Sequence, residues 1–184
     1  LNTEARQTRD YSRDVDAGAT SSGVEYISAV AGVFNPKSKA TFTPVDTDTV
    51  RGRRALVYEY EVKQPNSQLT LRAGDMAPVT VGSRGRIWLD RETNRVLRFE
   101  QIATEVPYDY PITAATSIID YDWVTISEQK YMLPTHSEIM MTQVNKSVSV
   151  QSRNEIRFRG YQKFGAELKV IDEIDEADFP PEKP

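Results

Sequence analysis

The chain has 184 residues, a formal net charge of −4 at pH 7 and no cysteine. This length favours a single domain, and the lack of cysteine excludes disulfides and cysteine-based metal sites. The mild acidity argues against a non-specific nucleic-acid binder, and no apolar run approaches the ~20 residues of a membrane-spanning helix.

The composition favours β-structure. Val, Ile and Thr together number 44, against 22 for Leu and Ala. Branching at Cβ suits a pleated, half-buried surface better than a helix. We therefore expect a mainly antiparallel β protein of the α+β class with little helix.

The first forty residues differ from the rest. Residues 1–20 are polar, which predicts a frayed helix or a lead-in without structure, and we expect any targeting peptide to lie outside these 184 residues. Ser21 and Ser22 are candidate N-caps for a short helix over residues 23–34. Asn35-Pro36 should end that helix, because a residue before proline avoids the α conformation. Its apolar stripe comprises Val24, Ile27, Val30, Ala31 and Phe34.

From residue 40 onward, apolar residues recur with a period of two. The alternation predicts strands over residues 56–62, 87–90, 96–103, 119–123, 132–144 and 148–164, with a polar turn over 90–95. Most of these strands have one apolar and one charged face, as in an antiparallel sheet covered on one side. Residues 63–78 should form a long loop or a short hairpin around 67–71, and residues 104–116 hold too many prolines for a central strand. We place one domain over 21–171, with a last edge strand at 167–171, and an acidic, proline-rich tail over 172–184.

Candidate catalytic chemistry is sparse. His136 is the one histidine, and without cysteine or clustered carboxylates it does not predict a metal site. Asp120 and Asp122 share a strand face about 7 Å apart, a separation at which a glycosidase pair can sit. Pairing with Arg157 and Arg159 across neighbouring strands explains these aspartates more simply. We therefore predict no catalytic residue, no metal and no cofactor, and keep a hydrolase using Asp120 and Asp122 as a minor alternative.

The large apolar side chains offer a binding function instead. Most of the aromatic and methionine residues should form ordinary core. A single curved sheet with one short helix leaves part of its hollow side unfilled, and flexible Met side chains suit an apolar groove that accepts varied guests. The set comprises Tyr58, Tyr60, Trp88, Phe99, Tyr121, Trp123, Met140 and Met141.

The hairpin over residues 85–100, GRIWLDRETNRVLRFE, resembles the "G-x-hydrophobic-W-hydrophobic-D-x-x-T-x-x-V-hydrophobic-R" hairpin of the bacterial outer-membrane lipoprotein-sorting (LolA/LolB-like) superfamily. Residues 121–124, 131–134 and 156–161 are similar to the closing strands of that group. The resemblance implies an open, curved antiparallel sheet (a half-barrel) around one or two short N-terminal helices. It also implies a periplasmic or secreted location and an apolar cavity that accepts acyl chains in carriers.

Two main hypotheses follow. The first is an extracytoplasmic carrier or binder of a lipid-like ligand or the acyl group of a lipoprotein, with a lipid or an acylated protein as its partner. Its expected cavity residues are Ile27, Phe34, Tyr58, Tyr60, Phe99, Tyr121, Trp123 and Met141. The alternative is a non-enzymatic protein-interaction or envelope-sensor module whose core is filled.

Overall fold

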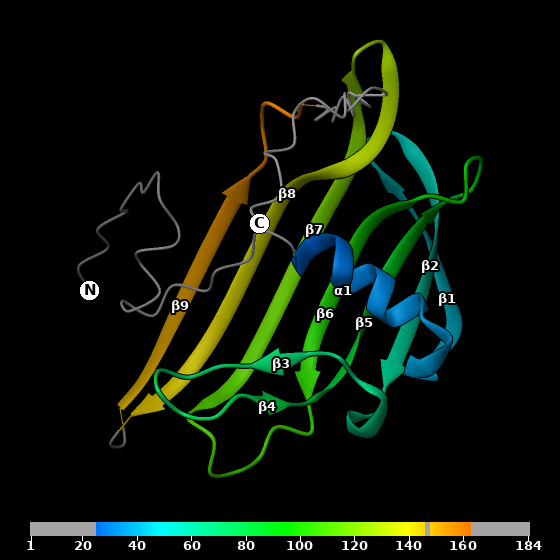
Figure 1. Cartoon of the computed structure of the whole chain (residues 1–184). Helices are drawn as coiled ribbons and strands as arrows, with labels where there is room; N and C mark the ends of the chain where they lie inside the picture. Colours follow the sequence, from blue (N-terminus) through cyan, green and yellow to red (C-terminus); the bar gives the residue numbers. More distant parts are fainter. Residues whose placement is uncertain (1–24, 146–147, 163–184) are drawn as a thin grey trace, which may run out of the picture.

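The computed structural model describes residues 25–145 and 148–162, and its main element is one open antiparallel sheet. The sheet has seven strands in the order β1-β2-β5-β6-β7-β8-β9 (Figure 1). They are β1 (Thr41–Val50), β2 (Arg53–Val62), β5 (Gly82–Asp90), β6 (Val96–Thr104), β7 (Ile112–Ile126), β8 (Gln129–Asn145) and β9 (Val148–Arg157). The predicted class, mainly antiparallel β with little helix, is confirmed.

The remaining elements are short. Helix α1 (Glu25–Phe34) leads through the 3-10 turn η2 (Pro36–Ser38) into β1. Between β2 and β5, the 3-10 turn η3 (Gln64–Asn66) precedes a small two-stranded sheet of β3 (Thr70–Leu71) and β4 (Val79–Thr80). Among the described helices, none combines the length and apolar character that a membrane crossing requires. The predicted lead-in, tail and edge strand at 167–171 lie outside the described residues.

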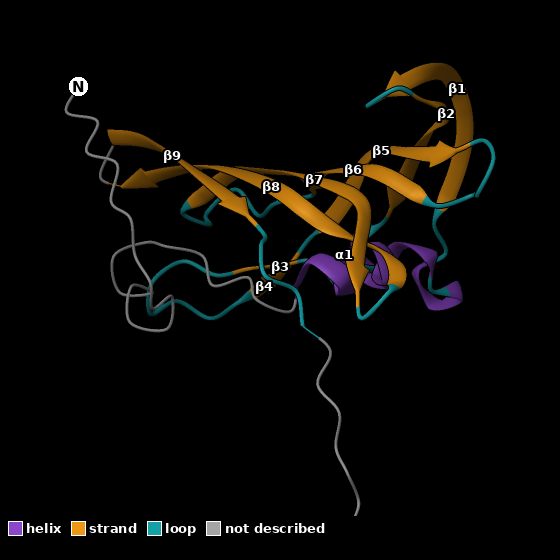
Figure 2. Cartoon of the chain, turned by 90° about the horizontal axis from the view of Figure 1, so that it is seen from above, coloured by secondary structure: helices purple, strands orange, loops and turns teal. Residues whose placement is uncertain are grey.

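Both α1 and the β3–β4 arm cover the same face of the sheet (Figure 2). The strand register shows which residues point toward them, because cross-strand partners share a face. Tyr58 is paired with Ile87, Ile87 with Phe99, and Phe99 with Ile119. These residues belong to the helix-facing side, which we call the inner face.

The inner face holds two separate hydrophobic clusters. The helix cluster, under α1, comprises Val33, Tyr60, Val62, Ile87, Phe99, Ile119 and Tyr121. The arm cluster, under β3 and β4, comprises Leu71, Ala73, Val81, Tyr110 and Ile112. In each cluster, apolar side chains of the inner face are removed from water by the element that covers them. The helix α1 and the β3–β4 arm are therefore each held by their own core.

The outer face is also covered at one end, contrary to the prediction of a single covered side. Val57 and Trp88 are cross-strand partners, one residue out of phase with Tyr58 and Ile87, and they form a third cluster with Val50, Ala55 and Leu97. Strands β1 and β2 bend away from α1 (Figure 2), and the Trp88 indole donates a hydrogen bond of 2.9 Å to Asp48 of β1. A buried Trp N–H needs such an acceptor.

The predicted strands over 56–62, 87–90, 96–103, 119–123 and 132–144 are confirmed, each inside a longer observed strand. Strand β9 ends at Arg157, before the predicted limit, and β7 begins at Ile112, inside the segment that we expected to be too proline-rich. The prolines occupy the preceding loop, where the Tyr110 hydroxyl donates a 3.0 Å hydrogen bond to the carbonyl of Leu71. The loop is thereby tied to the β3–β4 arm.

Helix α1 ends at Phe34, as Asn35-Pro36 predicts, but it is rotated relative to the expected stripe. Val33 is buried, and Ala29 and Val30 pack against the helix cluster. Ala31 and Phe34, which the stripe places inward, are exposed. The predicted stripe was therefore wrong in two respects: it omitted Val33, which is buried, and it included Ala31 and Phe34, which are exposed.

Candidate functional site

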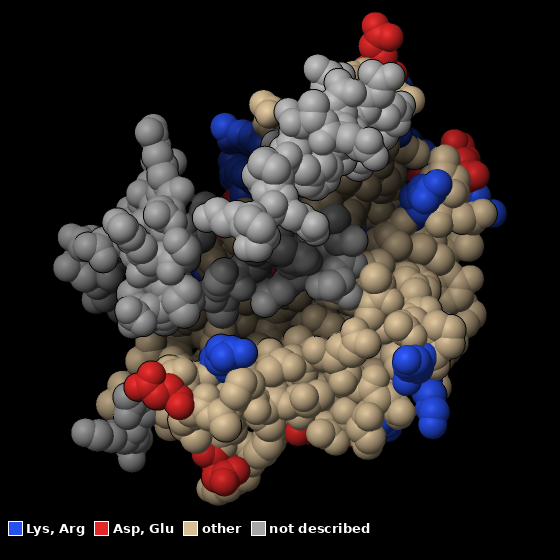
Figure 3. Space-filling model, in the orientation of Figure 1, with Lys and Arg blue, Asp and Glu red and all other residues tan. Residues whose placement is uncertain are grey.

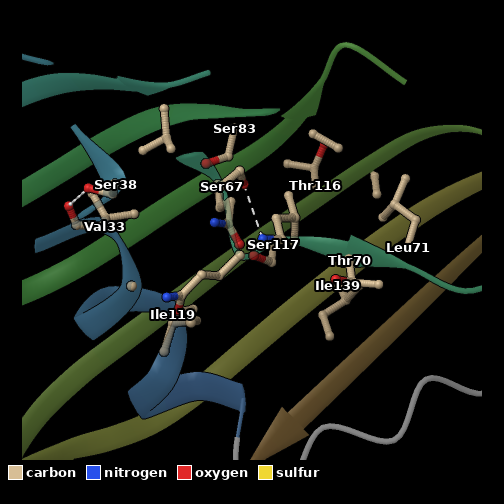
Figure 4. A pocket seen from close by; sticks show the side chains of 18 of the residues that line it. Val33, Ser38, Ser67, Thr70, Leu71, Ser83, Thr116, Ser117, Ile119 and Ile139 are labelled. Atoms are coloured by element: carbon tan, nitrogen blue, oxygen red, sulfur yellow. Dashed lines mark hydrogen bonds between the residues drawn. The ribbon is translucent and has the colours of Figure 1, made fainter. Parts of the chain in front are cut away.

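A cavity of about 290 Å³ lies on the inner face, between the helix cluster and the arm cluster. Its roof comprises one side of α1, Ser38 of η2 and the segment Ser67–Leu71, and its floor comprises β2 and β5 to β8 (Figure 4). The volume is at the lower end of the range of small-molecule sites, about 300–1,000 Å³.

The cavity exists because small side chains occupy inward positions in the middle of the floor. Ser83 of β5 faces Ala103 of β6, while Ala115 and Ser117 follow at alternate positions on β7. On α1, Gly32 likewise presents no side chain to the cavity. On either side of this patch, larger inward residues fill the space under α1 and under the arm.

Among the described residues that line the cavity, none is charged. Its polar groups are hydroxyls and amides, and its apolar groups are aliphatic. Two of the roof hydroxyls have local partners. Ser38 Oγ lies 2.8 Å from the carbonyl oxygen of Val33 and 2.7 Å from that of Asn35, and Ser67 Oγ accepts a 3.1 Å hydrogen bond from Leu69 N–H. Such a lining suits an uncharged guest, because a charge removed from water without a partner is strongly disfavoured.

One buried polar group beside the floor is unsatisfied. Tyr60 is 3% exposed, and its hydroxyl has no hydrogen bond of ordinary geometry among the described residues. Burial raises the pKa of Tyr60, and the neighbouring polar groups of Ser83 and Gln101 offset part of that effect. Ser83 and Gln101 both line the cavity. The wall therefore offers the hydroxyl of Ser83 and the amide of Gln101, and the buried Tyr60 phenol lies next to them.

Of the eight residues that the sequence singled out for the cavity, Met141 lines it. Tyr60, Phe99 and Tyr121 belong to the helix cluster, where the Tyr60 and Phe99 rings stack with centroids 5.4 Å apart. Tyr58 and Trp123 are half-buried, and neither lines the cavity. Phe34 is 48% exposed at the end of α1. The side chain of Ile27 lies outside what the structure describes.

Apart from Met141, the lining residues were not predicted, because large apolar side chains were taken as the mark of the cavity. A usable signal was nonetheless present. Ser83, Ala103, Ala115 and Ser117 occupy the inward phase of β5, β6 and β7, the phase that also holds Ile87, Phe99 and Ile119. A run of small residues at inward positions on adjacent strands predicts missing volume in the core.

The two aspartates lie on the outer face, away from the cavity, and arginines neutralise them. Arg98 Nε lies 2.8 Å from Asp120 Oδ1, and Arg51 lies 3.1 Å from Asp120 and 3.5 Å from Asp122. Burial alone would raise the pKa of Asp120, but hydrogen bonds and charge from Arg98 and then Arg51 outweigh it, so the pKa is lowered. A carboxyl with a lowered pKa is a poor general acid at neutral pH.

The predicted pairing of these aspartates with Arg157 and Arg159 is wrong. β8 lies between β7 and β9, so the two sets of residues are not on adjacent strands. Arg157 instead pairs with Glu155 at 2.9 Å. His136, on β8, lies 3.6 Å from Asp120 and 3.3 Å from Glu155. Over residues 25–145 and 148–162, no group of three or more His, Asp or Glu side chains is placed to hold a metal ion.

Comparisons of the chain with protein-family models, with curated proteins and with solved structures found no significant match. The resemblance to the lipoprotein-sorting superfamily therefore remains a prediction from the sequence.

Proposed function

We propose that this chain is a non-enzymatic, extracytoplasmic binding or carrier protein for a lipid-like ligand, whose uncharged apolar part occupies the cavity on the inner face. The observation that carries the proposal is the cavity itself. It has about 290 Å³ of space, a described lining without charged residues, and a floor of small side chains between two well-filled clusters.

The lining defines the chemistry of the ligand. Aliphatic contacts come from Val62, Ile119, Ile139 and Met141, among others, and each buried methylene of a ligand contributes roughly 0.8 kcal/mol. Ser83 and Gln101 offer neutral hydrogen bonds at one wall. An acyl chain with an ester or hydroxyl group fits this lining. A free carboxylate or phosphate buried in it would find no cationic partner in the part of the lining that the structure describes.

The half-barrel carrier architecture and the location outside the cytoplasm belong to the same proposal. They are supported by the open, bent sheet with α1 on its inner face and by the sequence resemblance over residues 85–100. Fractionation of cells that express the full gene product into periplasm and cytoplasm tests the location. Recovery from the cytoplasm alone would contradict it.

The proposed ligand class is tested with three probes that share a twelve-carbon chain: glycerol monolaurate, which is uncharged, laurate, and dodecyltrimethylammonium. Each is titrated against the protein loaded with the uncharged dye N-phenyl-1-naphthylamine, and displacement is followed by fluorescence. We expect glycerol monolaurate to bind at least about tenfold more tightly than either charged probe, because a buried unpaired charge costs well over 1.4 kcal/mol. Equal affinity for the three probes, or no displacement by any, would refute the proposal.

A further inference from the structure

The connection between α1 and β1 presents two stacked phenylalanines to solvent. Phe34, the last residue of α1, and Phe42 of β1 lie with ring centroids 5.4 Å apart and ring planes 12° apart. Phe34 is 48% exposed and Phe42 is 40% exposed. Single exposed apolar residues are ordinary, but two aromatic rings together form a local apolar surface.

The same connection is locally basic in an acidic chain. Lys37 and Lys39 lie between the two phenylalanines and are exposed, and residues 34–45 include no Asp or Glu. The chain as a whole has a net charge of −4. Figure 3 shows Lys and Arg side chains over the η2 corner, at the lower right, with no acidic side chain beside them.

Hydrogen bonds hold the connection in one shape. Asn35 Oδ1 accepts a 2.9 Å hydrogen bond from Lys37 N–H, and Ser38 N–H donates a 2.9 Å hydrogen bond to the carbonyl of Asn35. Lys39 adopts a left-handed backbone conformation with φ of 49°. Aromatic rings and lysines are thus displayed on a preorganised corner, which lowers the entropic cost of binding.

We propose that the segment Phe34–Phe42 docks on the surface of an anionic lipid bilayer. Aromatic side chains favour the headgroup region, and lysines beside them are attracted to anionic lipids. Charge complementarity selects this partner. An acidic protein is attracted to an anionic surface only where basic side chains gather, and at this corner two exposed lysines lie beside the two exposed rings.

The corner also adjoins the cavity. Val33, near the end of α1, and Ser38, the last residue of η2, both line it. If the proposed function holds, a bilayer docked at this corner lies next to the cavity wall, and the ligand is exchanged with that bilayer. Docking itself does not depend on the cavity, so the two proposals can fail separately.

The test is flotation of the full chain with phosphatidylcholine vesicles, with and without about one third phosphatidylglycerol, at about 0.1 M salt, where the Debye length is about 10 Å. We expect binding to the anionic vesicles only, and its loss at about 1 M salt. The double variant Lys37→Gln/Lys39→Asn should weaken partitioning about 30-fold, since each lysine near an anionic surface contributes about fivefold. Asn is chosen for position 39 because it tolerates the left-handed conformation.

A second pair of variants tests the rings. Phe34→Ser/Phe42→Thr should weaken partitioning more than about tenfold, because the exposed ring surface no longer enters the headgroup region. Matched controls are Arg91→Gln/Arg95→Gln, which removes two exposed charges from the β5–β6 turn, and Tyr108→Ser, which removes a fully exposed ring from another loop. Both controls should partition like the parent, and melting curves verify that every variant is folded.

No partitioning of the parent chain onto anionic vesicles would overturn the docking proposal, as would an equal loss in the Arg91/Arg95 control. The variant Ala115→Leu, which narrows the cavity, should still float with the vesicles. Flotation together with no binding of the twelve-carbon probes would leave docking intact and refute the cavity function alone.

Discussion

Filling the cavity should stabilise the protein and weaken ligand binding at the same time. Ala115 of β7 lines the cavity beside the arm cluster, whereas Ala114, next to it in the chain, is exposed. Leucine at position 115 projects three additional carbon atoms into the cavity. Leucine at position 114 projects the same atoms into solvent, and so provides a control on the same strand.

The magnitude follows from the burial of those carbons. Each methylene removed from water contributes about 0.8 kcal/mol, or about 2.4 kcal/mol for three. Fixing the Leu rotamer costs about 0.5–1 kcal/mol. We therefore expect Ala115→Leu to raise the free energy of unfolding by about 1.5 kcal/mol, which corresponds to roughly 3–6 °C in Tm for a domain of this size.

The assay combines thermal unfolding of the delipidated protein with titration of glycerol monolaurate. We expect Ala115→Leu to bind this probe at least about tenfold more weakly, because the introduced side chain occupies the space of the ligand. Ala114→Leu should leave both Tm and affinity close to the parent values. A drop in Tm for Ala115→Leu with unchanged affinity would mean that the cavity is neither empty space nor the ligand site.

Three further predictions concern the sheet. The hydrogen bond from Arg53, outweighing burial, and the backbone N–H groups of the following turn hold the pKa of Asp90 well below its usual range. Its contribution to stability is therefore present above pH ~4 and lost as pH falls below it. At pH 7, Asp90→Asn should lower the free energy of unfolding by about 2 kcal/mol. In urea titrations repeated at decreasing pH, the variant should lose less stability than the parent, because it lacks the carboxylate that becomes protonated. Asp120→Ala should destabilise by about 1.5 kcal/mol, because it removes the carboxylate that accepts hydrogen bonds from the partly exposed Arg98 guanidinium, and should leave probe affinity unchanged. Gly85→Ala should cost about 3 kcal/mol or more in the same urea titration, because the added Cβ would lie 1.9 Å from the backbone oxygen of Glu100; a loss under 0.5 kcal/mol for any of the three would contradict the assigned contacts.

The strand positions were predictable because a strand buried on one face has apolar residues at every second position. Residues 56–62, 96–103 and 119–123 alternate clearly, and each lies inside an observed strand. The polar turn over 90–95 marks the hairpin between β5 and β6. In these segments the alternation of apolar and polar residues agrees with the burial that the sheet imposes, and the sequence pattern then predicts the strand.

Strand β1 was not identified because its burial pattern is not periodic. Nine of its ten residues are exposed, and it includes Pro44 beside a register shift. Proline is tolerated in an edge strand or at a bulge, and β1 is both at the edge and irregular. Its pairing is a hairpin with β2, and the Asp48–Trp88 hydrogen bond, which joins residues 40 apart in the sequence, ties it to β5.

A cavity on the hollow side of the sheet was predicted, but most of its lining residues were not. The hollow side of the sheet does hold a cavity, but the aromatic rings expected around it mostly fill the core beside it. Which side chains fill a core and which leave space depends on how α1 is rotated and where the β3–β4 arm packs. Neither is encoded in the alternation of a single strand. Small inward residues such as Ser83 and Ala103 indicate where the core leaves space.

Native mass spectrometry of the gently purified protein, with Tm measured before and after delipidation, tests the central claim most directly. The account predicts an additional mass that corresponds to an uncharged acyl-containing molecule. It also predicts a fall in Tm on delipidation of about 5–10 °C, as expected for a ligand present at about 100 times its Kd. A single apoprotein mass, with a Tm that neither delipidation nor added glycerol monolaurate changes, would contradict it.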